Sequence, residues 1–306
     1  MLRANGRRET GIVSGVKKPL RYAFFALLAL VLIAGAAILS REPRGDREWV
    51  DEFVRTPTAW ENGIGVFYIR NVRDWTYGTG SVLSKDWIDE VEADPRKITR
   101  AWFMEEPFPS WSAVGHTYLS FEFNDGTALS FSVEARMQKG QNYSALRGLF
   151  QQYELTYSWG TERDFLARRI LLLGHSVRMY PLAIEPDVAR ALFRALAEKT
   201  TELAGHPRFY NTLTANCTNI LAEIVNGAYP ESIPYDISWN FPGSSDSFLM
   251  SMGYIRAEGS VEEERSRHDL GQYREEIAHI ATSDQKMFSG EIRTLLERVR
   301  TTSSPP

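Results

Sequence analysis

The sequence predicts an α+β protein in which an antiparallel sheet packs against helices, preceded by one transmembrane helix at the N-terminus. Three patterns support this prediction. Apolar and polar residues alternate along 116–136, apolar residues recur at helical spacing along 186–203, and residues 22–39 carry no charge. The composition is 43% hydrophobic and 24% charged, which is typical of a folded protein and excludes a disordered or collagen-like chain.

The N-terminal apolar segment is just long enough to cross a membrane. It reads YAFFALLALVLIAGAAIL, and a helix needs about 20 predominantly apolar residues to span a bilayer. Basic residues of the N-terminal part all precede it, namely Arg3, Arg7, Arg8, Lys17, Lys18 and Arg21. By the positive-inside rule, residues 1–21 are then cytoplasmic, and 22–40 form a signal anchor in the inner membrane. The rest of the chain lies in the periplasm or otherwise outside the cytoplasm. A cleaved secretory signal, with a site at Ala34-Gly35-Ala36, is the alternative.

Charge and cysteine content narrow the possible partners of the exported part. Beyond residue 40 the chain has 29 basic and 38 acidic side chains, so it has no general attraction for phosphate backbones. We therefore expect a membrane partner but no nucleic acid. The single cysteine, Cys217, excludes an intramolecular disulfide and a cysteine-rich zinc module. The sequence contains no H-E-x-x-H motif, P-loop or dinucleotide fingerprint, so we expect no metal and no cofactor.

The exported part is expected to form a single domain with strands and helices in a mixed order. Its limits are a polar tether with a short helix at 41–60, the domain itself at 61–300, and a disordered tail at 301–306. The expected elements are strands at 65–72 and 153–159, a hairpin at 116–136, an amphipathic helix at 186–203, and a short helix that begins near Cys217 and is stopped by Gly227.

The register of the hairpin decides which side chains meet. A two-residue turn pairs Leu119 with Ser132, whereas a three-residue Asn-Asp-Gly loop, with Gly126 in the left-handed conformation, pairs Leu119 with Phe131. A slip of one residue turns every side chain to the other face, so the buried face selects the second register. That register places His116 directly across from Glu134, on the same face.

Cys217 has the surroundings of a nucleophile. It follows Thr214 and Asn216, which are good helix caps, and precedes an apolar helix, so its sulfur lies in the first helical turn. The unpaired N–H groups and the dipole of that turn favour a thiolate. The alternative is a small buried hydrophobic residue, which is the usual role of a lone cysteine.

His116 is the best candidate for the base that such a thiol needs. Glu134 lies opposite and can orient the ring, which completes an arrangement of nucleophile, base and orienting group. An ordinary cross-strand ion pair is the alternative. The remaining histidines have simpler settings: a loop for His175, a turn for His206, and charged helical segments for His268 and His279.

Five further residues are candidates for contact with a substrate. Tyr118 and Ser120 lie two and four residues beyond His116 on the same strand face, so they would line the cleft. Tyr210 and Asn216 are polar and close to the cysteine in sequence, and Arg163 could hold an anionic group or pair with Glu162. Backbone N–H groups at the start of the cysteine helix would hold an oxyanion.

Several motifs resemble those of the Lnb N-terminal periplasmic domain family. They are Gly115-His116-Thr117, Ser132-Val133-Glu134-Ala135-Arg136, Tyr143-Ser144-Ala145-Leu146-Arg147-Gly148, Gln152-Tyr153-Glu154-Leu155, Glu162-Arg163-Asp164 and Tyr210-Asn211-x-Leu213-Thr214-x-Asn216-Cys217-Thr218. The resemblance implies a membrane-anchored, extracytoplasmic protein, and in the enzymatic branch an intramolecular acyl transfer on lipoproteins. The order of histidine and cysteine also resembles circularly permuted papain-like enzymes, which work through a thioester.

The resemblance assigns Cys217 as the nucleophile, His116 as the base and Glu134 as a possible orienting group. We therefore expect an acyltransferase or hydrolase that acts on an envelope lipid, lipoprotein or peptide. A non-catalytic envelope protein that uses the same fold for binding or assembly is the alternative from another class. A redox sensor ranks last because no resolving cysteine is present.

Overall fold

The computed structural model describes residues 17–109, 111–229 and 232–302. The chain divides into two units, one up to Glu42 and one from Pro43 onward. In the first, helix α1 (Lys17–Leu39) contains an apolar stretch, Leu20–Ile38, that is long enough to cross a membrane. Among the described residues, this is the one helix with that property.

The second unit is built around an eight-stranded sheet with the strand order β1-β2-β9-β8-β7-β6-β10, and β5 pairs with β2 outside this path. All neighbouring strands are antiparallel except β2 and β9. The strands are β1 (Thr58–Glu61), β2 (Phe67–Arg73), β5 (Trp87–Ala93), β6 (Ile98–Phe108), β7 (Trp111–Phe123), β8 (Ala128–Arg136), β9 (Glu154–Thr161) and β10 (Arg178–Pro181). A separate pair comprises β3 (Thr76–Gly78) and β4 (Ser81–Ser84).

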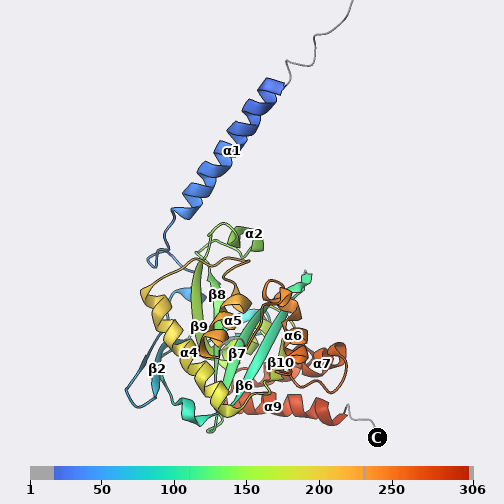
Figure 1. Ribbon diagram of the computed structural model, residues 1–306. Coiled ribbons are helices and arrows are strands. Elements are labelled where there is room, and N and C mark those ends of the chain that lie inside the picture. Colours follow the sequence, from blue (N-terminus) through green and yellow to red (C-terminus); the bar gives the residue numbers. More distant parts are fainter. Residues whose placement is uncertain (1–16, 110, 230–231, 303–306) are drawn as a thin grey trace, which may run out of the picture. The chain divides into compact units, whose positions relative to one another are not determined.

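Helices cover both faces of this sheet, so the predicted α+β class is confirmed (Figure 1). On one face, α4 (Pro186–Gly205) and α5 (Cys217–Ala228) share a core with Phe121 and Phe131 of the sheet. On the other, α3 (Glu162–Ala167), the π-helical turn η3 (Arg168–Leu172), α8 (Arg274–Ile280) and α9 (Gln285–Thr302) pack around Trp102 and Tyr118. Alternation along each strand sends successive side chains to opposite cores.

Shorter elements complete the second unit. They are the helices α2 (Ala145–Gly148), α6 (Ser245–Ser251) and α7 (Val261–His268), and the 3-10 turns η1 (Asp51–Phe53), η2 (Pro95–Lys97), η4 (Ile237–Trp239), η5 (Pro242–Ser244) and η6 (Leu270–Tyr273).

The hairpin of β7 and β8 has the register that the buried face predicts. Leu119 pairs with Phe131 and Phe121 pairs with Leu129. The N–H of Phe123 donates to the carbonyl of Thr127, which closes a three-residue loop, and Gly126 has a φ of +85°. This left-handed conformation suits glycine because it has no Cβ.

The two strands of this hairpin separate before they end. Their pairing stops at Tyr118 and Ser132, although both strands continue. Beyond that point β7 still pairs with β6 and β8 still pairs with β9. The sheet therefore opens between β7 and β8 next to His116, and this opening receives the start of α5.

Both ends of the exported part differ from the expected limits. Pro43 already belongs to the folded unit, Trp49 is buried, and β1 joins the sheet where a tether was expected up to residue 60. Helix α9 continues to Thr302, two residues into the tail expected at 301–306, and residues 303–306 lie outside the described part.

Candidate active site

Cys217 is the first residue of helix α5, and Asn216 is the cap of that helix. The side-chain oxygen of Asn216 accepts bonds from the N–H groups of Thr218 and Asn219, and the Asn219 side chain accepts one from the Asn216 N–H. This capping box fixes the direction in which the helix starts. Cys217 is only 4% exposed, so its thiol is held among protein atoms.

The sulfur of Cys217 lies at the opening between β7 and β8. The backbone N–H of Thr117 donates a hydrogen bond to it, and the hydroxyl oxygen of Thr218 is 3.8 Å away. His116 is a third hydrogen-bond partner of the thiol. The cysteine and the histidine, 101 positions apart in the sequence, are thus in contact.

The other side of the His116 ring faces a carboxylate. Its Nε2 atom is 2.7 Å from the hydroxyl of Ser132 and 3.2 Å from an oxygen of Glu134. The Ser132 hydroxyl donates to the same Glu134 oxygen at 2.8 Å, so Nε2 must be the donor in its bond to Ser132. The remaining ring nitrogen, Nδ1, is then the one that can exchange a proton with Cys217.

These contacts favour an ion pair between the two residues. Burial opposes the protonated form of His116, but the charge of Glu134 and the bond to Cys217 outweigh it and raise its pKa to about 10. Burial also opposes ionisation of the thiol, but the bonds from His116 and Thr117 outweigh it and lower the pKa of Cys217. A thiolate beside an imidazolium is the reactive form of a cysteine nucleophile.

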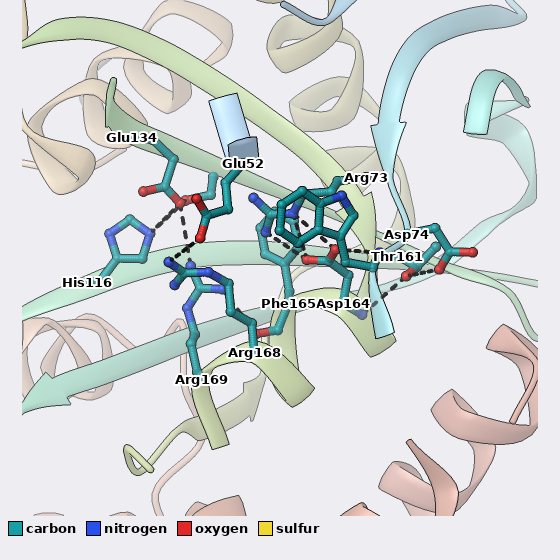
Figure 2. A network of polar contacts seen from close by, with 12 residues as sticks. Glu52, Arg73, Asp74, His116, Glu134, Thr161, Asp164, Phe165, Arg168 and Arg169 are labelled. Atoms are coloured by element: carbon teal, nitrogen blue, oxygen red, sulfur yellow. Dashed lines mark hydrogen bonds and ion pairs between the residues drawn. The ribbon is translucent and has the colours of Figure 1, made fainter. Parts of the chain in front are cut away.

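Arg169 of η3 holds the orienting carboxylate from the opposite side. Its Nη2 is 3.4 Å from Glu134, and its Nε is 2.8 Å from Glu106, which lies opposite His116 on β6. Burial disfavours the charge on Glu134, but His116 and Arg169 outweigh it and lower the pKa of this carboxyl. Figure 2 shows Glu134 between His116 and Arg169, with the buried Arg73–Asp164 pair beside them.

Cys217, His116 and Glu134 border a cavity of about 210 Å³, here called the polar cavity. Tyr143 and Tyr210 also line it, and their hydroxyls are 3.2 Å apart. Its lining also includes Glu106, Phe108, Arg169 and His175. Among the described residues, no group of three or more histidine, cysteine or acidic side chains is arranged to hold a metal ion.

A second and larger cavity, of about 410 Å³, lies on the α5 face of the sheet and is here called the apolar cavity. Its lining is mostly aliphatic and aromatic and includes Leu119, Leu192, Leu221, Val225 and Phe248. Its polar lining includes Thr117 and Thr218, whose hydroxyls are hydrogen-bonded at 3.0 Å. Both threonines also contact the sulfur of Cys217, which lines the polar cavity, so this pair separates the thiol from the apolar cavity.

Comparison with protein families places this site in a known domain. The family described as the Lnb N-terminal periplasmic domain matches residues 84–239, just over half of the chain. The chain belongs to this family. The match spans His116, Glu134 and Cys217 and ends at the turn η4, before helices α6 to α9. Neither the curated proteins nor the solved structures contain a match to the chain.

Membership of the Lnb N-terminal periplasmic domain family agrees with the apolar helix α1. A periplasmic domain that follows one N-terminal apolar helix fits a single-pass, membrane-associated protein. The family match confirms the resemblance seen in the motifs. Together with α1, it also supports a membrane-associated protein with a periplasmic domain.

Within this family domain, the structure brings together Cys217, His116, Glu134 and Tyr210, but not the other expected contact residues. Tyr118 is fully buried against Phe165, and Ser120 donates to Glu162, because α3 and α9 cover that face of β7. Neither residue lines the polar cavity.

Arg163 and Asn216 are also occupied elsewhere. Arg163 pairs with Asp74 and donates to the carbonyl of Ser283, which differs from both expected roles. The amide nitrogen of Asn216 donates to the carbonyls of Thr212 and Trp239, while its oxygen caps α5. Asn216 therefore shapes the helix start and does not line the polar cavity.

The residues of the site that were not expected from the sequence include Ser132, Arg169 and Glu106. Ser132 could have been found from the hairpin register, because it lies two residues from Glu134 on the same face. Glu106 required the pairing of β6 with β7, and no strand was predicted over 98–108. Arg169 adjoins an apolar run and gave no signal of its own.

Proposed function

We propose that this chain is a membrane-anchored, cysteine-dependent acyltransferase or hydrolase that works through a thioester on Cys217. The observation that carries the proposal is the contact of Cys217 with His116 in the polar cavity, next to the two threonines that line the apolar cavity. In this proposal Glu134 orients His116. The anchor lies in the inner membrane, and the domain is a circularly permuted relative of the papain fold, since its histidine strand precedes its cysteine helix.

The first step would be attack of the Cys217 thiolate on an ester or amide carbonyl. The C–S bond forms, the bond to the leaving group breaks, and His116 gives its proton to the departing oxygen or nitrogen. Water or an amine then attacks the thioester and releases the acyl group. The raised pKa of His116 and the lowered pKa of Cys217 support this assignment of base and nucleophile.

Fewer backbone N–H groups at the start of α5 are available to hold the oxyanion than the sequence implies. Asn216 accepts the N–H groups of Thr218 and Asn219, so both are already bonded. The N–H of Cys217 has no hydrogen-bond partner within the described part of the chain. We therefore assign this N–H to the oxyanion, with one hydroxyl of the hydrogen-bonded Tyr143–Tyr210 pair as a further donor in the polar cavity.

The apolar cavity favours a lipid or lipoprotein over a peptide as the acyl donor. A flexible hydrocarbon chain gains free energy when it leaves water for an aliphatic lining, by about 0.8 kcal/mol per buried CH₂ group. The hydroxyls of Thr117 and Thr218 lie at the boundary between this lining and the thiol. A chain in the apolar cavity could thus present its carbonyl to Cys217. Helix α1 would keep the domain at a membrane, where such donors are concentrated.

The test is acylation of the full-length chain in detergent micelles by 4-nitrophenyl esters with acetyl or octanoyl chains. We expect a transient mass increase on Cys217 that is absent from Cys217→Ala and strongly reduced in His116→Asn. We also expect faster acylation by the octanoyl ester. Absence of any mass increase on Cys217 with both esters would argue for the binding or assembly protein instead.

A variant of the apolar cavity separates chain recognition from thiol reactivity. Val225 is half-buried on α5 and lines this cavity, so Val225→Phe fills part of it while leaving Cys217 and His116 in place. Acylation by the octanoyl ester should slow at least about tenfold, and acylation by the acetyl ester should stay within about twofold, as expected if several CH₂ groups lose their site. Equal slowing with both esters would argue against chain binding in this cavity.

A further inference from the structure

The polar cavity contains a second histidine. His175 lies in the segment that follows η3 and lines the same cavity as Cys217 and His116. Its side chain is 24% exposed, compared with 13% for His116, so it is the more accessible of the two imidazoles. Its ring also packs near Phe108, at the end of β6.

His175 has its own carboxylate, which orients it as Glu134 orients His116. The Nδ1 atom of His175 is 2.5 Å from Glu106, a buried residue of β6. Burial disfavours the charge on Glu106, but the bond from His175 and the charge of Arg169 outweigh it and lower the pKa of this carboxyl. A charged carboxylate only accepts hydrogen bonds, so Nδ1 carries the proton.

This geometry leaves the other ring nitrogen of His175 available. In the neutral ring Nε2 then holds the lone pair, and it has no hydrogen-bond partner among the residues that the structure describes. His116 differs, because its two nitrogens are engaged by Cys217 on one side and by Ser132 and Glu134 on the other. The polar cavity therefore offers one imidazole bound to the nucleophile and one that is open to an incoming molecule.

Arg169 joins the two histidine–carboxylate pairs into one unit. It bonds Glu106 through Nε and Glu134 through Nη2, and Glu106 and His116 are directly opposite each other on neighbouring strands. The spacing of the pairs is thus fixed by buried groups. A residue that served only to neutralise Glu106 would not need to be open to the cavity, since Arg169 already supplies a charge.

We propose that His175, oriented by Glu106, is the base that activates the acyl acceptor when the thioester on Cys217 is resolved. This role rests on the proposed thioester chemistry. The acceptor is a small O–H or N–H nucleophile, either water or an amine, that enters the polar cavity. It gives its proton to Nε2 of His175 as its lone pair attacks the thioester carbonyl. The C–S bond then breaks, Cys217 leaves as the thiolate, and the proton on His175 returns through solvent to His116.

The experiment separates the two half-reactions in the full-length chain in detergent, with 4-nitrophenyl acetate as the probe. The initial burst of nitrophenolate measures acylation of Cys217, and decay of the acetylated mass measures deacylation. In His175→Asn we expect a burst rate within about twofold of wild type. Deacylation should fall at least about 10²-fold, which is the usual size of a general-base contribution. His206→Asn, at the exposed end of α4, is the matched control and should change neither rate.

A second variant distinguishes a base from a structural partner of Glu106. In His175→Gly, added imidazole should restore deacylation in proportion to its concentration and leave the burst unchanged. If the His175 variants acylate and deacylate at the wild-type rates, the role of His175 is overturned but the proposed function is not. The same holds if both rates fall equally and imidazole does not rescue them. A wild-type chain that shows no burst and no acetylated Cys217 overturns the proposed function, and this role with it.

Discussion

The backbone N–H of Thr117 donates a hydrogen bond to the sulfur of Cys217 at the point where β7 and β8 stop pairing. An N–H group in the middle of a sheet normally bonds a neighbouring strand. Here the sheet is open at this position, so the N–H of Thr117 bonds the side chain of Cys217, the first residue of α5. The nucleophile is therefore held by the backbone of the strand that also carries its base.

The first prediction concerns the pH dependence of thiol reactivity. Because His116 and Thr117 lower the pKa of Cys217, its alkylation by iodoacetamide should have a midpoint below about 8.5, the value for a free cysteine. His116→Asn removes the imidazolium, so the midpoint should move to about 8.5 or above. The rate of alkylation, measured by mass spectrometry between pH 4 and pH 10, checks this. A midpoint that is the same in both proteins would contradict the ion pair.

The second prediction concerns the carboxylate that orients the base. In Glu134→Gln the ring loses the charge that keeps its pKa high, so His116 should deprotonate at lower pH than in the native protein. Alkylation of Cys217 at pH 7 should slow by about tenfold or more, the factor that corresponds to a change of about 1.4 kcal/mol. Titration of the His116 ring by NMR gives an independent measurement. Glu92→Gln, on an exposed strand position, serves as the control.

The third prediction concerns the buried guanidinium that joins Glu106 and Glu134. Arg169→Met should destabilise the domain by roughly 3–5 kcal/mol at pH 7, because the buried Glu106 and the partly buried Glu134 lose their shared cation. The lowered pKa values of both carboxyls mean that Arg169 stabilises the native state above about pH 4.5, and that this contribution is lost as the pH falls through those values.

The difference in melting temperature between wild type and Arg169→Met should accordingly be largest near neutral pH and should narrow as the pH falls below about 4.5. Thermal unfolding followed by circular dichroism at several pH values measures it. A difference that stays constant over this range would show that the lost stability comes from packing around Arg169, whose guanidinium lies 4.2 Å from the ring of Tyr118, and not from its charge.

The fourth prediction compares a buried ion pair with an exposed one. Arg73 and Asp164 are both buried and share three hydrogen bonds of 2.7 to 3.0 Å, so Asp164→Ala leaves an uncompensated charge and should cost roughly 3–5 kcal/mol. Asp89→Ala removes a surface pair with Arg55 and should cost less than about 1 kcal/mol. Urea unfolding of both variants tests the contrast, and equal losses would contradict it.

Local patterns predicted the parts of the site that depend on neighbours in the sequence. The register of β7 and β8 followed from alternation and one turn, and it brought His116 to Glu134. The cap at Asn216 and the helix after it followed from residue types that favour helix starts. These features need few contacts from distant segments.

The remaining parts depend on which helix covers which face. Tyr118 shares a strand face with His116, yet α3 and η3 pack over it, so it lies in the core. That placement depends on segments more than 40 positions away in the sequence, so the residue pattern of β7 alone could not predict it. Arg169 and Glu106 meet for the same reason, since one lies on a helical turn and the other on a strand that was not predicted.

The Thr117–Thr218 pair has a kinetic consequence. It lines the apolar cavity and contacts Cys217, which lines the polar cavity, so in the proposed reaction the molecule that delivers the acyl group and the molecule that removes it would occupy different spaces. An enzyme arranged in this way would follow ping-pong kinetics, with parallel double-reciprocal plots and little inhibition by an excess of either substrate.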